Sequence, residues 1–190
     1  MSNRALIVVD IQNDYFPGGD WELSGIESAS DNAAKLIAAA RKNGDTIVHI
    51  RHEFPSNEAP FFRPGSKGAQ TNEKVSAKDQ EKVIVKNHVN SFRDTELKEL
   101  LDSKKIEELV ICGAMSHMCI DAITRAAADF GFKATVIHDA CASRDLEFEG
   151  VKVPAKQVHA AFMASLGFAY ATMSSTAQYL NSCLAAAKHS

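Results

Sequence analysis

The sequence has few of the features that mark membrane, secreted or nucleic-acid-binding proteins. No apolar run approaches the roughly 20 residues that a membrane helix needs. The N-terminal run, residues 5–9, is too short for the apolar region of a secretory signal. Basic residues number 21 and acidic residues 24, without a basic stripe, so a nucleic-acid partner is not expected. We therefore expect a cytoplasmic protein with no membrane association.

Cysteine pairs with zinc or redox spacing are also absent. The four cysteines are Cys112, Cys119, Cys141 and Cys183. None of them belongs to a CxxC pair or has a histidine at zinc-finger spacing. In a reducing cytoplasm they should remain free thiols. A free cysteine is most often a small buried hydrophobic residue, so a chemical role for any one of them needs a separate reason.

The composition is otherwise that of an ordinary globular chain, with 45% hydrophobic and 24% charged residues. A chain of 190 residues has the size of a single domain. It contains no internal repeat, low-complexity tract or linker-like segment that would divide it. The sequence predicts one domain, residues 1–190.

Short β-branched runs alternate with segments of helical periodicity along this chain. We predict strands at residues 5–9, 46–50, 83–85, 109–113, 134–137 and 168–172. Helices are predicted at residues 29–40, 94–103, 120–130, 155–166 and 173–184. Such alternation is typical of βαβ units with right-handed crossovers. The predicted fold is α/β: a three-layer, doubly wound, six-stranded, mostly parallel sheet with helices on both faces.

Two segments that follow predicted strands carry information about ligands. The first turn, residues 10–14, lacks the glycines of a dinucleotide site, so a nucleotide cofactor is not expected. Residues 52–80 carry three prolines and two glycines and show little periodicity. Irregular segments of this length inside a compact domain are usually functional, so this one is a candidate lid.

Three chemically active side chains follow predicted strands. Asp10 ends the first strand, Lys86 ends the third, and Cys119 opens the helix after the fourth. Because parallel strands place their carboxyl ends at one edge of the sheet, these side chains can meet there. A helix N-terminus and an ammonium would both lower the pKa of the thiol. Asp10 could exchange protons, and backbone N–H groups at the helix start could bind an oxyanion.

Each of these residues also has an ordinary structural explanation. An aspartate after a strand often caps a turn or helix, a lysine at a strand end is usually solvated, and a cysteine at a helix start usually packs in the core. Only their coincidence at three strand ends of one sheet favours a chemical site.

Taken together, the sequence motifs resemble those of the isochorismatase-like cysteine hydrolases. This family includes nicotinamidases, ureidoacrylate and N-carbamoyl amidohydrolases, and streptothricin hydrolase. The resemblance covers most of the chain. The matching segments are Ala5-Leu6-Ile7-Val8-Val9-Asp10-Ile11-Gln12-Asn13-Asp14, Val85-Lys86, Gly113-Ala114-Met115-Ser116-His117-Met118-Cys119-Ile120, Thr124-Arg125-Ala126-Ala127-Ala128-Asp129-Phe130-Gly131 and Asp139-Ala140-Cys141-Ala142.

The resemblance implies a catalytic triad of Asp10, Lys86 and Cys119. It implies a cis peptide bond between Ala114 and Met115, and an oxyanion hole made by the backbone N–H groups of Met115 and Cys119. It also implies a homodimer or higher homo-oligomer, a small amide or ureido substrate and no cofactor. The apolar C-terminal helix around residues 180–184 only permits such association.

The sequence departs from the family pattern after the second strand. Nicotinamidases carry an aspartate and a histidine there as metal ligands, and the resemblance places His52 and Phe54 at those positions. No metal is therefore expected, although His52 or Glu53 could bind an ion. Isochorismatases proper cleave a vinyl ether and lack the nucleophilic cysteine, so Cys119 argues against that activity.

Several side chains near the predicted edge are candidates to line a substrate pocket, and some of the aromatic ones could instead pack the loop onto the sheet. The candidates are Gln12, Phe16, Trp21, Phe61, Asn90, Phe92, His117 and Phe148. Arg63 and Arg144 would suit a substrate carboxylate, or are simply solvated.

The sequence thus favours a cysteine hydrolase that cleaves a small amide or ureido C–N bond through a Cys119 thioester. Two alternatives stay open. One is a cysteine-independent vinyl-ether hydrolase of the isochorismatase type. The other is a ligand-binding α/β module without turnover, because fold does not determine function.

Overall fold

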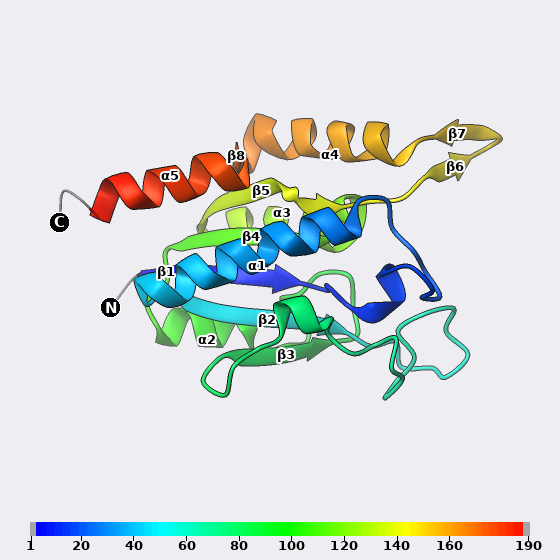
Figure 1. Ribbon diagram of the computed structural model, residues 1–190, viewed down its shortest axis with the longest axis horizontal. Coiled ribbons are helices and arrows are strands. Elements are labelled where there is room, and N and C mark those ends of the chain that lie inside the picture. The colour runs from blue at the N-terminus through cyan, green and yellow to red at the C-terminus, as the bar shows by residue number, and fades with distance from the viewer. Residues whose placement is uncertain (1–2, 188–190) are drawn as a thin grey trace.

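The computed structural model describes residues 3–187. These residues contain the predicted six-stranded parallel sheet (Figure 1). The strand order is β3-β2-β1-β4-β5-β8, and every neighbouring pair is parallel. The strands are β1 (Arg4–Val9), β2 (Thr46–His52), β3 (Lys82–Lys86), β4 (Glu108–Ala114), β5 (Lys133–Ala142) and β8 (Ala171–Ser174). The doubly wound α/β prediction is confirmed.

Helices cover both faces because the buried strands are apolar on both sides. In β1, Ile7 packs in a cluster with residues of α2 (Leu97–Ser103), α3 (Asp121–Asp129) and α4 (Ala155–Ala169). Its neighbour Leu6 packs in a second cluster with α1 (Ile26–Asn43), against which α5 (Thr176–Ala187) also lies. The alternation of side chains along a strand thus gives each helical layer its own core.

The strand order reverses between β1 and β4, so the crevice of the sheet lies at their carboxyl ends. Gly113 makes the close approach of these two strands possible. Its φ is 127°, and a Cβ there would lie 1.9 Å from the carbonyl oxygen of Val9. Only glycine therefore fits at this point of β4.

The irregular segment between β2 and β3 crosses the carboxyl edge and is fastened to the turn after β1. Asp14 Oδ2 accepts a hydrogen bond of 2.6 Å from the Phe62 N–H. The Asp14 N–H donates to the carbonyl of Gly68 at 2.9 Å. A side chain at Gly68 would collide with the Asp14 carboxylate. The segment contains one short 3-10 turn, η2 (Glu73–Val75), and a similar turn, η1 (Asn13–Tyr15), follows β1.

Three elements differ from the predictions, one of them the last helix, α5, which begins at Thr176 because Met173 belongs to β8. The strand predicted at residues 168–172 begins later than expected. Helix α4 continues through Gly167 to Ala169, and β8 begins at Ala171. Leu166 is fully buried and accepts the N–H of Tyr170, so packing and hydrogen bonds carry the helix past the glycine. The sequence also missed a hairpin, β6 (Leu146–Phe148) and β7 (Val151–Val153), which projects from one end of the molecule in Figure 1.

The hairpin is short enough to escape detection from periodicity. Glu149 and Gly150 form its turn, and both have positive φ, of 50° and 81°. That geometry is typical of a two-residue turn whose twist matches that of the strands. Among residues 3–187, no helix combines the length and apolar character that crossing a membrane requires.

We expect Gly113→Ala to destabilise the protein by about 2–4 kcal/mol, because the added Cβ combines a backbone clash with a conformation that alanine avoids. Gly18→Ala is the control, since Gly18 has a φ of 84° but nothing within 4 Å of its would-be Cβ. That variant should lose only about 1 kcal/mol. Urea unfolding of both variants tests this, and equal losses would contradict the steric explanation.

Candidate active site

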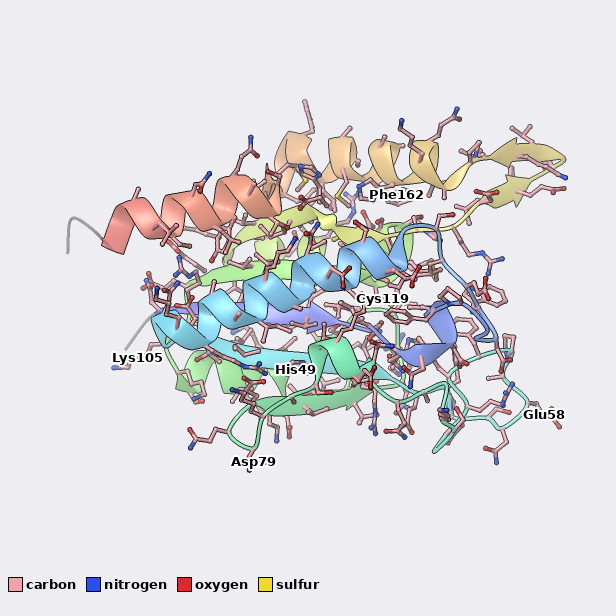
Figure 2. The ribbon with its side chains drawn as sticks, in the orientation of Figure 1. His49, Glu58, Asp79, Lys105, Cys119 and Phe162 are labelled. Atoms are coloured by element: carbon pink, nitrogen blue, oxygen red, sulfur yellow. The ribbon has the colours of Figure 1, made fainter. Side chains whose placement is uncertain are left out.

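Asp10, Lys86 and Cys119 meet at the carboxyl edge of the sheet. Lys86 Nζ lies 2.9 Å from Asp10 Oδ2 and 3.1 Å from Cys119 Sγ. All three residues are buried, with Cys119 only 3% exposed. Figure 2 labels Cys119, which lies beyond the end of β1. A carboxylate, an ammonium and a thiol therefore share one enclosed site.

Each of the three is positioned by a different element. Asp10 follows β1 in the left-handed conformation, with a φ of 51°, and its N–H donates to the Ile50 carbonyl of β2. Lys86 is the last residue of β3, in register with His52 of β2. Cys119 lies in a π-helical turn, η3 (Ser116–Ile120), that leads directly into α3.

The Lys86 ammonium is the hub of the site. Besides Asp10 and Cys119, it lies 3.2 Å from His52 Nδ1 and donates to the carbonyls of His88 and Val89 at 3.1 and 3.3 Å. Burial opposes the charge, but the contacts with the Asp10 carboxylate and the Cys119 sulfur outweigh it and raise the pKa of Lys86. The ammonium is therefore a fixed positive charge in the interior.

The prediction of a lowered thiol pKa is wrong for this site. Burial raises the pKa of Cys119, the neighbouring Asp10 charge raises it further, and Lys86 opposes them without prevailing. A thiolate beside Asp10 would leave the buried site with a net negative charge, which is unfavourable. In the resting protein the group is thus a neutral thiol beside an ion pair.

The Asp10 carboxylate is available for proton exchange. Lys86 Nζ is its ion-pair partner, and the Cys119 thiol lies within hydrogen-bonding reach of the carboxylate. Atoms of Asp10, His52 and Cys119 lie within 4.8 Å of one another. This places a proton acceptor close to the thiol.

Gln12 anchors His52 and is not a pocket residue, which corrects the sequence interpretation. Its amide nitrogen donates to the carbonyls of His52 and Ala69, and its amide oxygen accepts the His52 N–H, each at 2.8 Å. Burial and the Lys86 charge lower the pKa of His52 to about 4. His52 is therefore neutral at physiological pH and can accept a hydrogen bond from Lys86.

The metal pair of nicotinamidases does not fit this sequence. Phe54 offers no ligand atom and instead packs its ring 4.5 Å from that of His52. Among the described residues, the candidate cluster of metal ligands is formed by Asp10, His52 and Cys119. The Lys86 ammonium already lies 2.9–3.2 Å from an atom of each, so a metal ion bound by all three would have to displace it.

The turn that carries Cys119 is fastened to β5. The Ala114–Met115 peptide bond is cis, and the carbonyl of Met115 accepts the N–H groups of Met118 and Ile120. Ser116 Oγ donates to the carbonyl of Ala142 at 3.1 Å. These contacts fix the turn at the edge of the sheet.

His117 occupies one side of this turn. Its Nδ1 lies 2.8 Å from Ser143 Oγ, and its ring meets that of Phe162, labelled on α4 in Figure 2. Burial lowers the pKa of His117, and the Arg144 charge lowers it further. A neutral imidazole half-exposed beside Cys119 is thus in a position to contact a substrate.

Aromatic side chains form a continuous wall from His52 outward. Phe54 packs on His52, Phe61 on Phe54 at 5.2 Å, and Trp21 stacks on Phe61 at 4.6 Å. Trp21 and Phe61 were predicted pocket residues, and Phe16 packs partly buried against the same cluster. Tyr15 and Phe62 belong to the same wall, as does Phe54, which the sequence analysis considered only at a metal-ligand position.

Three other pocket candidates, Asn90, Phe92 and Phe148, have different surroundings. Phe92 packs its ring against Phe130 and Phe132, beyond the C-terminal end of α3, so it belongs to the core. Asn90 Oδ1 accepts the Phe92 N–H and so closes a local turn. Phe148 lies on the β6–β7 hairpin and is 74% exposed. Periodicity could not place these residues because each lies in an irregular segment or a short hairpin.

Two of the hollows on the surface of residues 3–187 bear on where the site lies. One of about 250 Å³ adjoins the Cys119 turn and is lined by residues that include Ser143 and His159. The other, of about 1180 Å³, lies at the opposite edge of the sheet and is lined by Thr46, Lys82 and Glu107 among others. The larger hollow contains none of the predicted site residues, so size alone does not locate the chemistry.

Comparison with known proteins agrees with this geometry. The Isochorismatase domain family matches residues 4–178. The chain belongs to the isochorismatase family of hydrolases. The motifs at Asp10, Lys86 and Cys119 had predicted this membership.

Individual members of the isochorismatase family align with most of the chain. The uncharacterized family protein YddQ of Bacillus subtilis is 46% identical over 93% of this chain and 98% of its own. The crystal structure of an isochorismatase hydrolase from Oleispira antarctica superposes on this chain with a TM-score of 0.92. The two sequences are 52% identical, and the match covers 95% of this chain and 98% of that one. Maleamate amidohydrolase of Pseudomonas putida is 29% identical over 74% of this chain and 72% of its own.

The electrostatics of the Cys119 thiol give a testable prediction. Asp10→Asn removes the negative charge beside the thiol while the Lys86 ammonium stays, so the thiol pKa should fall. We expect Asp10→Asn to alkylate with iodoacetamide at Cys119 faster than the unmodified protein at neutral pH. Peptide mapping after brief labelling measures this. Slower labelling in the variant would contradict the electrostatic explanation, and Cys112, buried in β4, is the internal control.

The lowered pKa of His52 makes stability depend on pH. The unfolded chain binds this proton below about pH 6.5 and the native protein only near pH 4. The contribution of His52 to the free energy of unfolding is therefore fully present above about pH 6.5 and is lost as the pH falls towards 4. Between about pH 7.5 and about pH 5 the loss from this group should be about 2 kcal/mol. Urea unfolding of His52→Gln should show a shallower loss, and an unchanged slope would refute the assignment.

Proposed function

We propose that this protein hydrolyses a small amide or ureido compound through a covalent thioester on Cys119, without a cofactor. The observation that carries this proposal is the Lys86 ammonium, which lies 2.9 Å from the Asp10 carboxylate and 3.1 Å from the Cys119 sulfur in a buried site. A nucleophile, a proton acceptor and a charge that holds both are the elements of nucleophilic acyl transfer.

In the first half of the reaction, Asp10 accepts the thiol proton as the Cys119 sulfur attacks the carbonyl carbon. The oxyanion that forms is held by the backbone N–H groups of Met115 and Cys119. The C–N bond then breaks, and Asp10 returns the proton to the leaving nitrogen. The acyl group remains on sulfur as a thioester. Because the proton moves only as the bond forms, the raised resting pKa of the thiol is compatible with attack.

In the second half, Asp10 removes a proton from water, which attacks the thioester carbonyl. The C–S bond breaks, the acid leaves, and the sulfur recovers its proton from Asp10. Throughout, Lys86 balances the negative charge that passes between Asp10 and Cys119. Its ammonium provides the counter-charge to the Asp10 carboxylate in a site from which water is largely excluded.

The amide specificity is supported by relatives. Maleamate amidohydrolase, an amide hydrolase by name, shares the family and aligns with 74% of this chain. The presence of a buried cysteine beside the ammonium favours attack by sulfur over the vinyl-ether reaction that family members without this cysteine perform.

The test is a comparison of triad variants on an amide panel, with released ammonia as the readout. We expect Cys119→Ala, Cys119→Ser and Asp10→Asn each to lower turnover by about a thousandfold or more, with double variants scarcely worse than single ones. Groups that act as a unit are non-additive in this way. Trapping of a substrate-derived acyl adduct on Cys119 by mass spectrometry gives independent support.

The matched control is Cys112→Ala, which removes a buried thiol of β4 that does not touch the site. It should leave turnover within about threefold of the unmodified protein if it folds. Undiminished turnover in Cys119→Ala would overturn the proposal and favour a cysteine-independent reaction. Absence of turnover on every amide together with tight binding of one would favour a binding module.

A further inference from the structure

A chain of two hydrogen bonds connects the outer helix α4 to the turn that carries Cys119. His159 Nδ1 of α4 lies 2.8 Å from Ser116 Oγ, and Ser116 Oγ donates to the Ala142 carbonyl of β5 at 3.1 Å. Ser116 is completely buried, whereas His159 is half-buried. The reaction steps proposed for the triad use neither side chain, so their contact needs another explanation.

The polar groups of this chain fix the direction of each hydrogen bond. A carbonyl oxygen can only accept, so the single hydroxyl proton of Ser116 is directed at Ala142. The Ser116 oxygen then accepts from His159, which requires a proton on Nδ1 of the imidazole. Burial lowers the pKa of His159, and the His138 charge lowers it further. A protonated ring also carries a proton on Nδ1, so the donor is present in either charge state.

Ser116 is well placed to control the position of the nucleophile. It is the first residue of the π-helical turn η3, in which Cys119 is the fourth. The Met115 carbonyl just before it accepts the N–H groups of Met118 and Ile120, so the backbone around the serine forms one hydrogen-bonded unit. A buried hydroxyl that loses a partner is costly. The turn is therefore favoured in the position that satisfies both partners of Ser116.

Apolar contacts hold α4 in place independently of His159. Met163 and Leu166 pack in the core cluster that contains Cys119. Phe162, one turn beyond His159 and labelled in Figure 2, places its ring 6.1 Å from that of His117. We therefore expect the helix to stay docked when His159 is replaced, so that the loss of its hydrogen bond can be studied in a folded protein.

We propose that His159 is a positioning residue for the nucleophile. Its Nδ1–H, acting through the Ser116 hydroxyl, holds the turn in the position that keeps the Cys119 sulfur buried beside Lys86. The same restraint orients the backbone N–H groups proposed to bind the oxyanion. The inference rests on the proposed function for its effect on turnover, but the position of the sulfur can be measured without a substrate.

Two amide substitutions separate the Nδ1 donor from the rest of the ring. An asparagine places its N–H close to the position of Nδ1, and a glutamine close to that of Nε2. We expect His159→Gln to lower kcat on a hydrolysed amide by about tenfold or more with KM changed by less than about threefold, and His159→Asn to recover most of the loss. Ser116→Ala should match His159→Gln, and the double variant should be scarcely worse, because both act through one chain. Gln157→Ala, exposed on α4, is the matched control and should leave kcat unchanged.

Alkylation of Cys119 by iodoacetamide reports the position of the turn without any substrate. A turn released from α4 should expose the sulfur, so Cys119 should label about threefold or more faster in His159→Gln than in the unmodified protein. In His159→Asn it should label at the original rate. Peptide mapping measures both, and the buried Cys112 and Cys141 are internal controls, since a general loosening of the fold labels them as well.

Equal labelling of Cys119 in His159→Gln and the unmodified protein overturns the proposal, as does an unchanged kcat in that variant. Equal losses in His159→Asn and His159→Gln also overturn it, and so does labelling of Cys112 together with Cys119, which makes the histidine a purely structural residue. Failure of the proposed function gives a different result: no amide is hydrolysed, yet the labelling of Cys119 still distinguishes His159→Gln from His159→Asn.

Discussion

The buried Lys86 ammonium is the interaction on which the site depends. Burying a charge is costly unless several partners compensate it, and five groups surround this one. They come from the end of β1, the end of β2, the segment after β3 and the turn before α3. The need to surround one cation thus brings together parts of the chain that are more than a hundred residues apart.

The arrangement also explains why a cysteine can be deeply buried and still be proposed as a nucleophile. The resting site holds one positive and one negative charge with a neutral thiol, so it is balanced. Moving the thiol proton to Asp10 keeps the total charge unchanged, because the negative charge passes from oxygen to sulfur while Lys86 contacts both. A low thiol pKa is therefore unnecessary, although the sequence alone had favoured one.

Much of the fold was predictable because its strands are short β-branched runs and its helices are amphipathic. The meeting of Asp10, Lys86 and Cys119 was also predictable, since parallel strands end at one edge of the sheet. Features that depend on burial or on irregular backbone were not. The neutral thiol follows from the depth of the site, and the role of Gln12 in holding His52 follows from a contact across forty residues. The β6–β7 hairpin has too few residues to show a period.

The attachment of residues 53–81 to Asp14 has a consequence for how such a protein can diversify. This segment supplies Phe54, Phe61 and Phe62 to the wall of the site, and its backbone is secured to the turn after β1 at Phe62 and Gly68. Substitutions at Phe54 and Phe61, outside these anchors, can reshape the wall while the charged groups keep their positions. The range of accepted molecules and the bond-breaking chemistry are therefore separable traits, and selection can act on the first without disturbing the second.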